Sequence, residues 1–439
     1  MRIFSRRTRG QGADTLAPGS IDRDSEPSTG RIGTFAAFEI PNFRLLWLGM
    51  LFSMGAMQMN IIDRSWLAYH ISGSALALGL VALGRGLPQL ILAPLGGAAA
   101  DRFDKRKLLI VSQFALMFLS LVNAILVQLH VIQIWQLIVI GVFQGIFFPF
   151  TMPTRTAYIG DLVDEKRFSN ALALDSTGRN LNRVIAPSLG GILIAVSPTV
   201  AFYAIALFYL FAGLTIIRLP SPKAVTARTR SMMSDMIVGL RYLKARNSLI
   251  LLIGMAFVMV LLGGPYQQLL PVFQVNVLHV GPTALGLMYT AVGAGAVFGS
   301  LAAVYASESP NKRMIQLGAG ILVGLSVAGF AFSTSIIPAM FFLVIVGFMT
   351  DGYFTINRIL VMLETDREFY GRVVSIYMMT WSLMPLALLP MGVLTDSIGA
   401  PITIGVSGLI LAAFIASVTV FSPHIRRRED PSIVPAFSD

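Results

Sequence analysis

Long apolar runs, separated by short polar connections, fill the chain between residues 43 and 421. A helix needs about 20 residues to cross a bilayer, and each run reaches roughly that length. The runs are continuous rather than alternating, which excludes a β-barrel. We therefore predict an all-α membrane protein with twelve transmembrane helices. The expected spans are 45–69, 76–100, 108–129, 133–156, 168–195, 200–218, 248–274, 283–306, 313–333, 337–361, 371–395 and 400–421.

Polar segments at the two ends and in the middle divide the chain. Residues 1–42 and 422–439 are expected to be tails, the first of them flexible. The segment 219–247 separates two sets of six spans, 43–218 and 248–421, which we expect to form two six-helix bundles. Its second part, "SDMIVGLRYLKARN", places apolar residues at helical spacing with basic residues between them, which predicts an amphipathic helix on the membrane surface.

The basic residues predict the orientation. Six of the 33 Lys and Arg residues fall well inside spans, and the other 27 all fall in the two tails, in alternate connections, or at the span ends that border them. Because cytoplasmic segments are rich in Lys and Arg, both termini are expected in the cytoplasm. The net charge of +11 then indicates contact with anionic lipid at the cytoplasmic face, not with nucleic acid. Only 13% of the residues are charged, too few for a soluble globule, and the chain has no Cys.

The two halves of the chain repeat each other in the same orientation. Offsets of 207 and 203 residues align similar residues, which are Asp101 with Glu308, Lys105 with Lys312, Arg106 with Arg313, Arg155 with Arg358, Asp161 with Glu364, and Pro187 with Pro390. Parallel repeats of this kind are related by an axis along the membrane normal, and the substrate path then lies between the halves. Arg155 and Arg358 are expected to be structural, either snorkelling or pairing with Asp161 and Glu364.

A gating motif is predicted between the second and third spans. In "GGAAADRFDKRK" (96–107) an acid and a basic cluster follow small residues, so that the acid can hold one half against a helix N-terminus of the other. The expected gating residues are Asp101, Arg102, Lys105, Arg106 and Glu308. This segment resembles the signature loop of the major facilitator superfamily, although Asp104 stands where that family usually has Gly. The alternative is an ordinary basic loop.

Further segments resemble the branch of that superfamily that contains enterobactin exporters and macrolide efflux proteins. They include "MPTRTAYIGDLV", "NALAL" and "APSLGG" (186–191), the last being similar to an antiporter motif in which Gly replaces Ala186. The alternative for "APSLGG" is close packing of small residues. The resemblance covers residues 43–421 and implies proton-driven export of a small molecule, without indicating which one.

Polar residues inside the first six spans are the candidates for substrate binding. A charge at the bilayer centre costs about 3 kcal/mol on insertion scales, so it normally faces a cavity or a partner. The counterparts in the second half are mostly apolar, which argues against a requirement of the scaffold alone. The expected substrate-binding residues are Asn60, Asp63, Arg64, Arg85, Gln89, Arg179, Asn182 and Arg183. A structural alternative is an Asp175–Arg179 ion pair that holds helices together.

Three acids inside the spans are candidates for proton coupling, namely Asp351, Asp63 and Asp175. Asp63 and Asp175 each have an Arg close in sequence, and Asp63 is a plausible partner for Arg85. Asp351 has no base within one helical turn. Because a neighbouring Arg favours the charged form of a carboxyl, Asp351 is expected to exchange a proton most readily near neutral pH.

The sequence as a whole predicts a multi-pass transporter of the bacterial inner membrane that exports a small molecule in exchange for protons by alternating access. Arg outnumbers acid among the predicted binding residues, which favours an anionic substrate, either drug-like or siderophore-like. Uptake of an organic anion by proton symport is the first alternative, and a membrane sensor or lipid-handling protein is the second. No cofactor, metal site or catalytic constellation is expected, and the protein is expected to be a monomer.

Overall fold

The computed structural model of the protein describes residues 33, 35–221 and 232–421, without the side chains of residues 94, 96–98, 100–102 and 232–237. Residues 35–439 form one compact unit, separate from residues 1–34. Both predicted tails therefore lie largely outside the described residues. The first tail was expected to extend to residue 42, but the chain is already folded from Ala36, because a 3-10 helix packs there against the fifth long helix.

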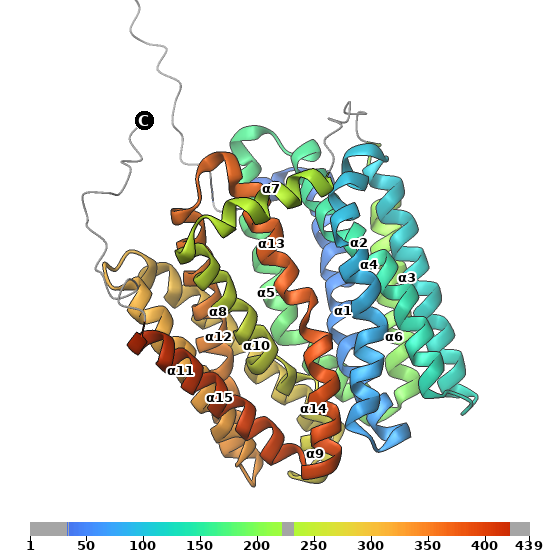
Figure 1. The fold of residues 1–439 in the computed structure, drawn as a ribbon. Helices are drawn as coiled ribbons and strands as arrows, with labels where there is room; N and C mark the ends of the chain where they lie inside the picture. Colours follow the sequence, from blue (N-terminus) through green and yellow to red (C-terminus); the bar gives the residue numbers. More distant parts are fainter. Residues whose placement is uncertain (1–32, 34, 222–231, 422–439) are drawn as a thin grey trace, which may run out of the picture. The chain divides into compact units, whose positions relative to one another are not determined.

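Six long helices follow in the first half of the chain (Figure 1). They are preceded by the 3-10 helix η1 (Ala36–Glu39), and their bounds are α1 (Pro41–Ser72), α2 (Ala75–Arg102), α3 (Lys105–Gln128), α4 (Ile134–Leu162), α5 (Glu165–Val196) and α6 (Pro198–Ile217). These agree with the first six predicted spans to within a few residues.

The second half repeats this order, with two of its spans broken. Its elements are α7 (Met232–Lys244), α8 (Asn247–Gly263), η2 (Pro265–Gln267), α9 (Leu270–Asn276), α10 (Pro282–Ser307), α11 (Lys312–Ala331), α12 (Ile336–Glu364), η3 (Arg367–Phe369), α13 (Tyr370–Ser382), α14 (Met384–Ile398) and α15 (Ala400–Phe421). The spans break before Pro265 and before Pro385, where proline lacks the N–H that a continuous helix needs.

Eleven segments among the described residues are long and apolar enough to cross a membrane, and α5 is not among them. It is 32 residues long but carries the polar stripe that includes Asp175, Arg179 and Arg183. Its length and its place beside α1 and α10 make it the twelfth span. The all-α, twelve-helix prediction is thus confirmed, and the described residues contain no strand.

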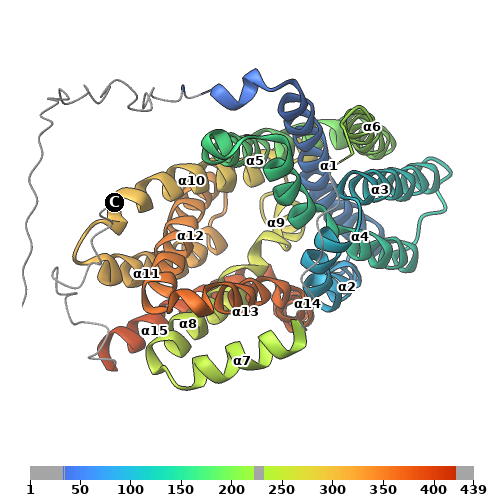
Figure 2. The same ribbon diagram turned by 90° about the horizontal axis from the view of Figure 1, so that it is seen from above.

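Helices α1–α6 pack mainly with one another, as do α8–α15 (Figure 2). We call these the first and second groups. Two helix pairs join them, α5 with α10 and α2 with α14. Glycines allow the first pair to approach closely, since a Cβ on Gly191 would lie only 2.7 Å from the Cα of Gly286. At Gly293, a Cβ would overlap the carbonyl oxygen of Arg183.

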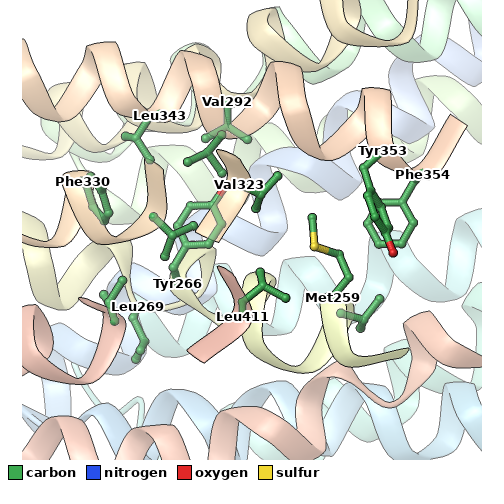
Figure 3. Close-up of a cluster of buried hydrophobic side chains, with 14 of the residues drawn as sticks. Met259, Tyr266, Leu269, Val292, Val323, Phe330, Leu343, Tyr353, Phe354 and Leu411 are labelled. Carbon is green, nitrogen blue, oxygen red and sulfur yellow. The ribbon is translucent and has the colours of Figure 1, made fainter. Parts of the chain in front are cut away.

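A continuous core of buried apolar side chains holds the second group together (Figure 3). It includes Met259, Phe273, Phe330 and Leu411, each at most 1% exposed. The rings of Phe273 and Phe330 lie 4.4 Å apart between their centroids. Apolar packing of this kind fixes the positions of the helices, but inside a membrane it needs close-fitting small residues as well.

The internal repeat is visible in two acid–base pairs at the end of the molecule that carries α7, which we call the α7 end. Lys105 at the start of α3 binds Asp161 at the end of α4, with 2.6 Å between nitrogen and oxygen. Arg313 and Glu364 make the equivalent pair between α11 and α12, at 2.5 Å. The expected pairing of Arg155 with Asp161 is therefore wrong. Among the described residues the buried guanidinium of Arg155 has no hydrogen-bond partner.

The predicted amphipathic helix is present as α7 and contacts the second group. Tyr242 stacks on Phe369, with ring centroids 4.1 Å apart, and its hydroxyl accepts a hydrogen bond from the backbone N–H of Asp366. Arg246 binds the carboxylate of Asp366 at 2.7 Å. The helix thus packs on the connection between α12 and α13, in addition to any contact with lipid.

Replacing Gly324 by Ala is expected to destabilise the second group. A Cβ there would overlap the carbonyl oxygen of Gly408 and lie 2.7 Å from the backbone nitrogen of Ala412, so α11 and α15 must separate. Overpacking typically costs about 1–3 kcal/mol. The measurement is the apparent melting temperature of the purified protein in detergent. Gly318→Ala on the same helix is the matched control, since its Cβ would meet nothing within 4 Å. Equal melting temperatures for the two variants would contradict the prediction.

Candidate functional site

An ion pair between the two groups lies at the centre of the candidate site. Arg183 of α5 donates from both terminal nitrogens to the two carboxylate oxygens of Asp351 on α12, each at 2.8 Å. The side chains are 40% and 24% exposed, respectively. A paired and partly exposed charge at mid-helix is what a polar passage between the groups requires, since a charge facing lipid would have neither partner nor water.

A cavity of about 180 Å³ adjoins Arg183. It lies between the groups, with Gln58 of α1 on one side and Gln267 of η2 and Tyr289 of α10 on the other. The Tyr289 hydroxyl donates to the backbone carbonyl of Gln267 at 2.7 Å, which fixes the ring beside the cavity. The sequence analysis missed these three residues because it weighed mainly charges. Neutral amides within apolar spans were the signal that could have identified Gln58 and Gln267.

The expectation that Asp351 has no basic neighbour is wrong. The sequence places no base within a turn of it, but Arg183 reaches it from 168 positions away. Its proposed exchange of a proton must therefore be considered together with its contact to Arg183. The role of Asp351 in proton coupling stays a prediction.

Further along α5 toward the α7 end, the predicted Asp175–Arg179 ion pair is present. Asp175 is buried, whereas Arg179 is about one-third exposed. Asn182 is half-buried and donates to the carbonyl of Gly178 at 3.2 Å, within its own helix. These contacts favour the structural alternative for Asp175, and they leave Arg183 as the residue of the stripe with a partner in the other group.

Arg64 is a structural anchor in this structure. Its side chain is buried and donates to the side-chain oxygen of Gln144 at 3.0 Å and to two backbone carbonyls, of Leu137 at 3.1 Å and of Val81 at 3.3 Å. It thereby ties α1 to α2 and α4. Gly141 leaves the space for this guanidinium, since a Cβ there would overlap it. Arg64 does not line the cavity beside Arg183, and its role in substrate binding stays a prediction.

Asp63 is 1% exposed, and among the described residues neither of its carboxylate oxygens has a hydrogen-bond partner. The side-chain nitrogen of neighbouring Asn60 is also unpaired and buried. The predicted pair between Asp63 and Arg85 is not formed. Arg85 instead places its guanidinium over the ring of Phe148, 5.1 Å from the centroid.

Arg85 and Gln89 are both half-buried on α2. Neither lines the cavity beside Arg183. The predicted substrate-binding residues therefore fall into separate places. Arg183 lies at the cavity, Arg85 and Gln89 lie on α2, and Asn60, Asp63 and Arg64 are buried inside the first group.

The predicted gating residues show contacts within one group where they are described. Lys105 binds Asp161, and Arg106 donates to Ser221 and to the carbonyl of Ile217. Glu308 is exposed. The side chains of Asp101 and Arg102 lie outside the described residues. Their role as a latch between the groups stays a prediction.

Known proteins resemble this chain over most of its length. The family described as "transmembrane secretion effector" matches residues 32–435. A staphyloferrin A transporter of Staphylococcus aureus is 25% identical, covering 79% of this chain and 88% of the relative. Macrolide efflux protein A of Streptococcus pyogenes is 22% identical, covering 87% and 95%. Enterobactin exporters match as well, at 22–24% identity.

Among solved structures, a bacterial homologue of the human lysosomal transporter Spinster has the same fold, in an inward-facing and occupied conformation. Its TM-score is 0.64 at 14% identity, covering 89% of this chain and 99% of that one. The predicted resemblance to the major facilitator superfamily and to its enterobactin-exporter and macrolide-efflux branch is confirmed. The family and the relatives are transporters and not enzymes, as the sequence predicted.

Replacing Arg64 by Ala is expected to lower stability, because three oxygen atoms on α2 and α4 lose their donor. Breaking such a buried contact typically costs roughly 1–3 kcal/mol. Arg85→Ala is the matched control, since Arg85 is only half-buried and its guanidinium rests on a ring. Thermal unfolding in detergent measures both. A variant Arg64→Ala that melts with the wild type would show that this anchor is dispensable.

Proposed function

Since this chain belongs to the transmembrane secretion effector family of the major facilitator superfamily, we propose that it exports a small molecule across the bacterial inner membrane in exchange for protons. The observation that carries the proposal is the ion pair of Arg183 with Asp351, which joins the two groups beside a cavity at mid-membrane. The exporters among its relatives support the direction of transport.

The positions of the hydrogen bonds between the two groups support alternating access. Among the described residues, several hydrogen bonds join the groups at Arg183 and beyond it, toward the end of the molecule that carries α9. Examples are Ser188 with Thr290, Ser65 with Gln268, and Tyr69 with Asn276. We propose that this α9 end faces outward and that the α7 end is cytoplasmic, as the basic residues predict. The structure then corresponds to an inward-facing state.

The ion pair determines which coupling each kind of substrate can have. Asp351 can hold Arg183, a proton or a cationic group, one at a time. A cationic substrate therefore competes with the proton, which is the condition for antiport and thus for proton-driven export. An anionic substrate competes with Asp351 for Arg183, and a proton on Asp351 then assists binding, which is the condition for symport.

An anionic substrate can still leave by antiport if another acid carries the proton while the protein returns without substrate. We propose Asp63 for this role, because an ionised carboxylate without a partner costs several kcal/mol when buried, and a proton removes that cost. Arg183, Gln58 and Gln267 would then bind a carboxylate-bearing or siderophore-like molecule. The guanidinium recognises the acid, and the amides recognise hydroxyl or amide groups.

Uptake of an organic anion by proton symport is the second candidate, favoured specifically by the pairing of Arg183 with Asp351. The direction test uses everted vesicles from cells that make the protein, with an acidic lumen. The probes are staphyloferrin A and a macrolide. An exporter that exchanges its substrate for protons accumulates its probe in the lumen when the pH gradient is imposed. Accumulation that requires an alkaline lumen would instead establish symport.

With a cationic probe, for which Asp351 is the coupling acid, replacing Asp351 by Asn is expected to abolish accumulation driven by the pH gradient. The side chain of Asn neither gains nor loses a proton, so protonation can no longer change its interaction with Arg183. Exchange of labelled for unlabelled probe without a gradient should persist, because it needs no net proton movement. Asp366→Asn, which removes an exposed acid far from the cavity, is the control. Full gradient-driven accumulation by Asp351→Asn would rule out this acid as the coupling residue.

A further inference from the structure

Near the end of α14, the carboxylate of Asp396 contacts the first residues of α2 in the other group. It accepts hydrogen bonds from the hydroxyl of Ser74 and from the backbone N–H of Ala75, both at 2.6 Å, and from the N–H of Leu76 at 3.1 Å. All three donors lie at the α9 end. The sequence analysis assigned no role to Asp396.

The contact satisfies groups that α2 cannot satisfy itself. The first backbone N–H groups of a helix have no partner within the helix, and they carry the positive end of its dipole. Ser74 precedes α2 and accepts from the N–H of Ala77 at 3.4 Å, but Ala75 and Leu76 donate to Asp396. A carboxylate suits this place, because hydrogen bonds to a charged acceptor are stronger than those to a neutral one.

Backbone packing holds Asp396 in register with α2. Gly392 lies one turn earlier on α14 and directly contacts the start of α2. A Cβ on Gly392 would be 2.9 Å from both the carbonyl oxygen of Ala75 and the Cα of Leu76. The two helices therefore touch through their backbones one turn from the carboxylate. Any separation of the groups at the α9 end breaks all three hydrogen bonds of Asp396 together.

We propose that Asp396 is the latch that keeps the α9 end closed. This proposal rests on the alternation between two states proposed above. It names a residue that would stabilise one of those states on the outward side. While the three hydrogen bonds persist, the second group is fixed to the N-terminus of α2. When the α9 end opens, the hydrogen bonds between Asp396 and the N-terminus of α2 are replaced by hydrogen bonds to water. Because Asp396 is exposed, its carboxylate does not become an unpaired buried charge.

The latch has a counterpart in the motif predicted at the opposite end of α2. There the sequence places Asp101, an acid expected to face a helix N-terminus of the second group. Each end of α2 would then carry one acid-to-helix contact between the groups, with the acid on α14 at one end and on α2 at the other. If one contact forms when the other breaks, the two states stay close in free energy. Substrate and protons can then shift the equilibrium between the two states.

Distance measurements between spin labels on the full-length chain in nanodiscs test the latch without any substrate. The chain has no Cys, so introduced cysteines are the only sites that react. His130→Cys and Thr334→Cys place labels on exposed connections of the two groups at the α9 end. Asp164→Cys and Asn311→Cys do the same at the α7 end, as a second reporter pair.

Asp396→Asn and Asp396→Ala are expected to raise the population of the longer α9-end distance about fivefold, which is the typical effect of losing one helix-capping carboxylate. The α7-end distance should shorten in parallel, which a merely misfolded variant would not show. Ser74→Ala removes one of the three donors and should produce a smaller shift in the same direction. The control Asp366→Asn should leave both distance distributions at their wild-type values.

Unchanged α9-end distributions in both Asp396 variants would overturn the latch. The same distance distributions distinguish a wrong latch proposal from a wrong proposed function. A wild-type protein that shows two distances at each end supports alternation whether or not Asp396 controls it. Distributions that shift in the Asp396 variants but not in Asp366→Asn support the latch, independently of what the protein transports.

Discussion

The need to keep charge away from lipid determines how this molecule is organised. The charged residues inside the spans are expensive in hydrocarbon, and each is accommodated in a different way. Arg183 pairs with an acid of the opposite group, Arg64 is surrounded by neutral oxygen acceptors, and Arg85 rests on an aromatic ring. Only the first of these solutions joins the two groups and borders a cavity, and this sets Arg183 apart as the functional centre.

Most of the fold could be predicted from the sequence, because hydropathy reports directly on the length of a helix in a bilayer. The polar helix α5 shows the limit of that signal. Composition alone fails to mark it as a span, whereas the alternation of basic and non-basic connections requires a span between α4 and α6. The breaks before Pro265 and Pro385 were not predicted, although proline marks both of them.

The site was harder to predict, because its contacts join residues that are far apart in the chain. Local spacing correctly placed Arg179 beside Asp175, but the Asp63–Arg85 pair expected between two helices is not formed, and the partner of Asp351 was not predicted. Arg64 and Arg183 look alike in the sequence, as arginines within apolar runs. Their different roles depend on neighbours contributed by other helices, namely Gln144 for the one and Asp351 for the other.

The glycines of α5 and α10 have a consequence for motion. Where Gly191 meets Gly286, and where Gly293 meets the carbonyl of Arg183, the helices touch along the main chain, and between these points the hydroxyl of Thr290 contacts Ser188 and the carbonyl of Val184. Helices that touch through glycines can turn on each other more easily than helices whose side chains interdigitate, because side-chain ridges packed in grooves must separate before the helices move. In the alternation proposed above, this seam is where the two groups can turn on each other, beside the ion pair of Arg183 with Asp351.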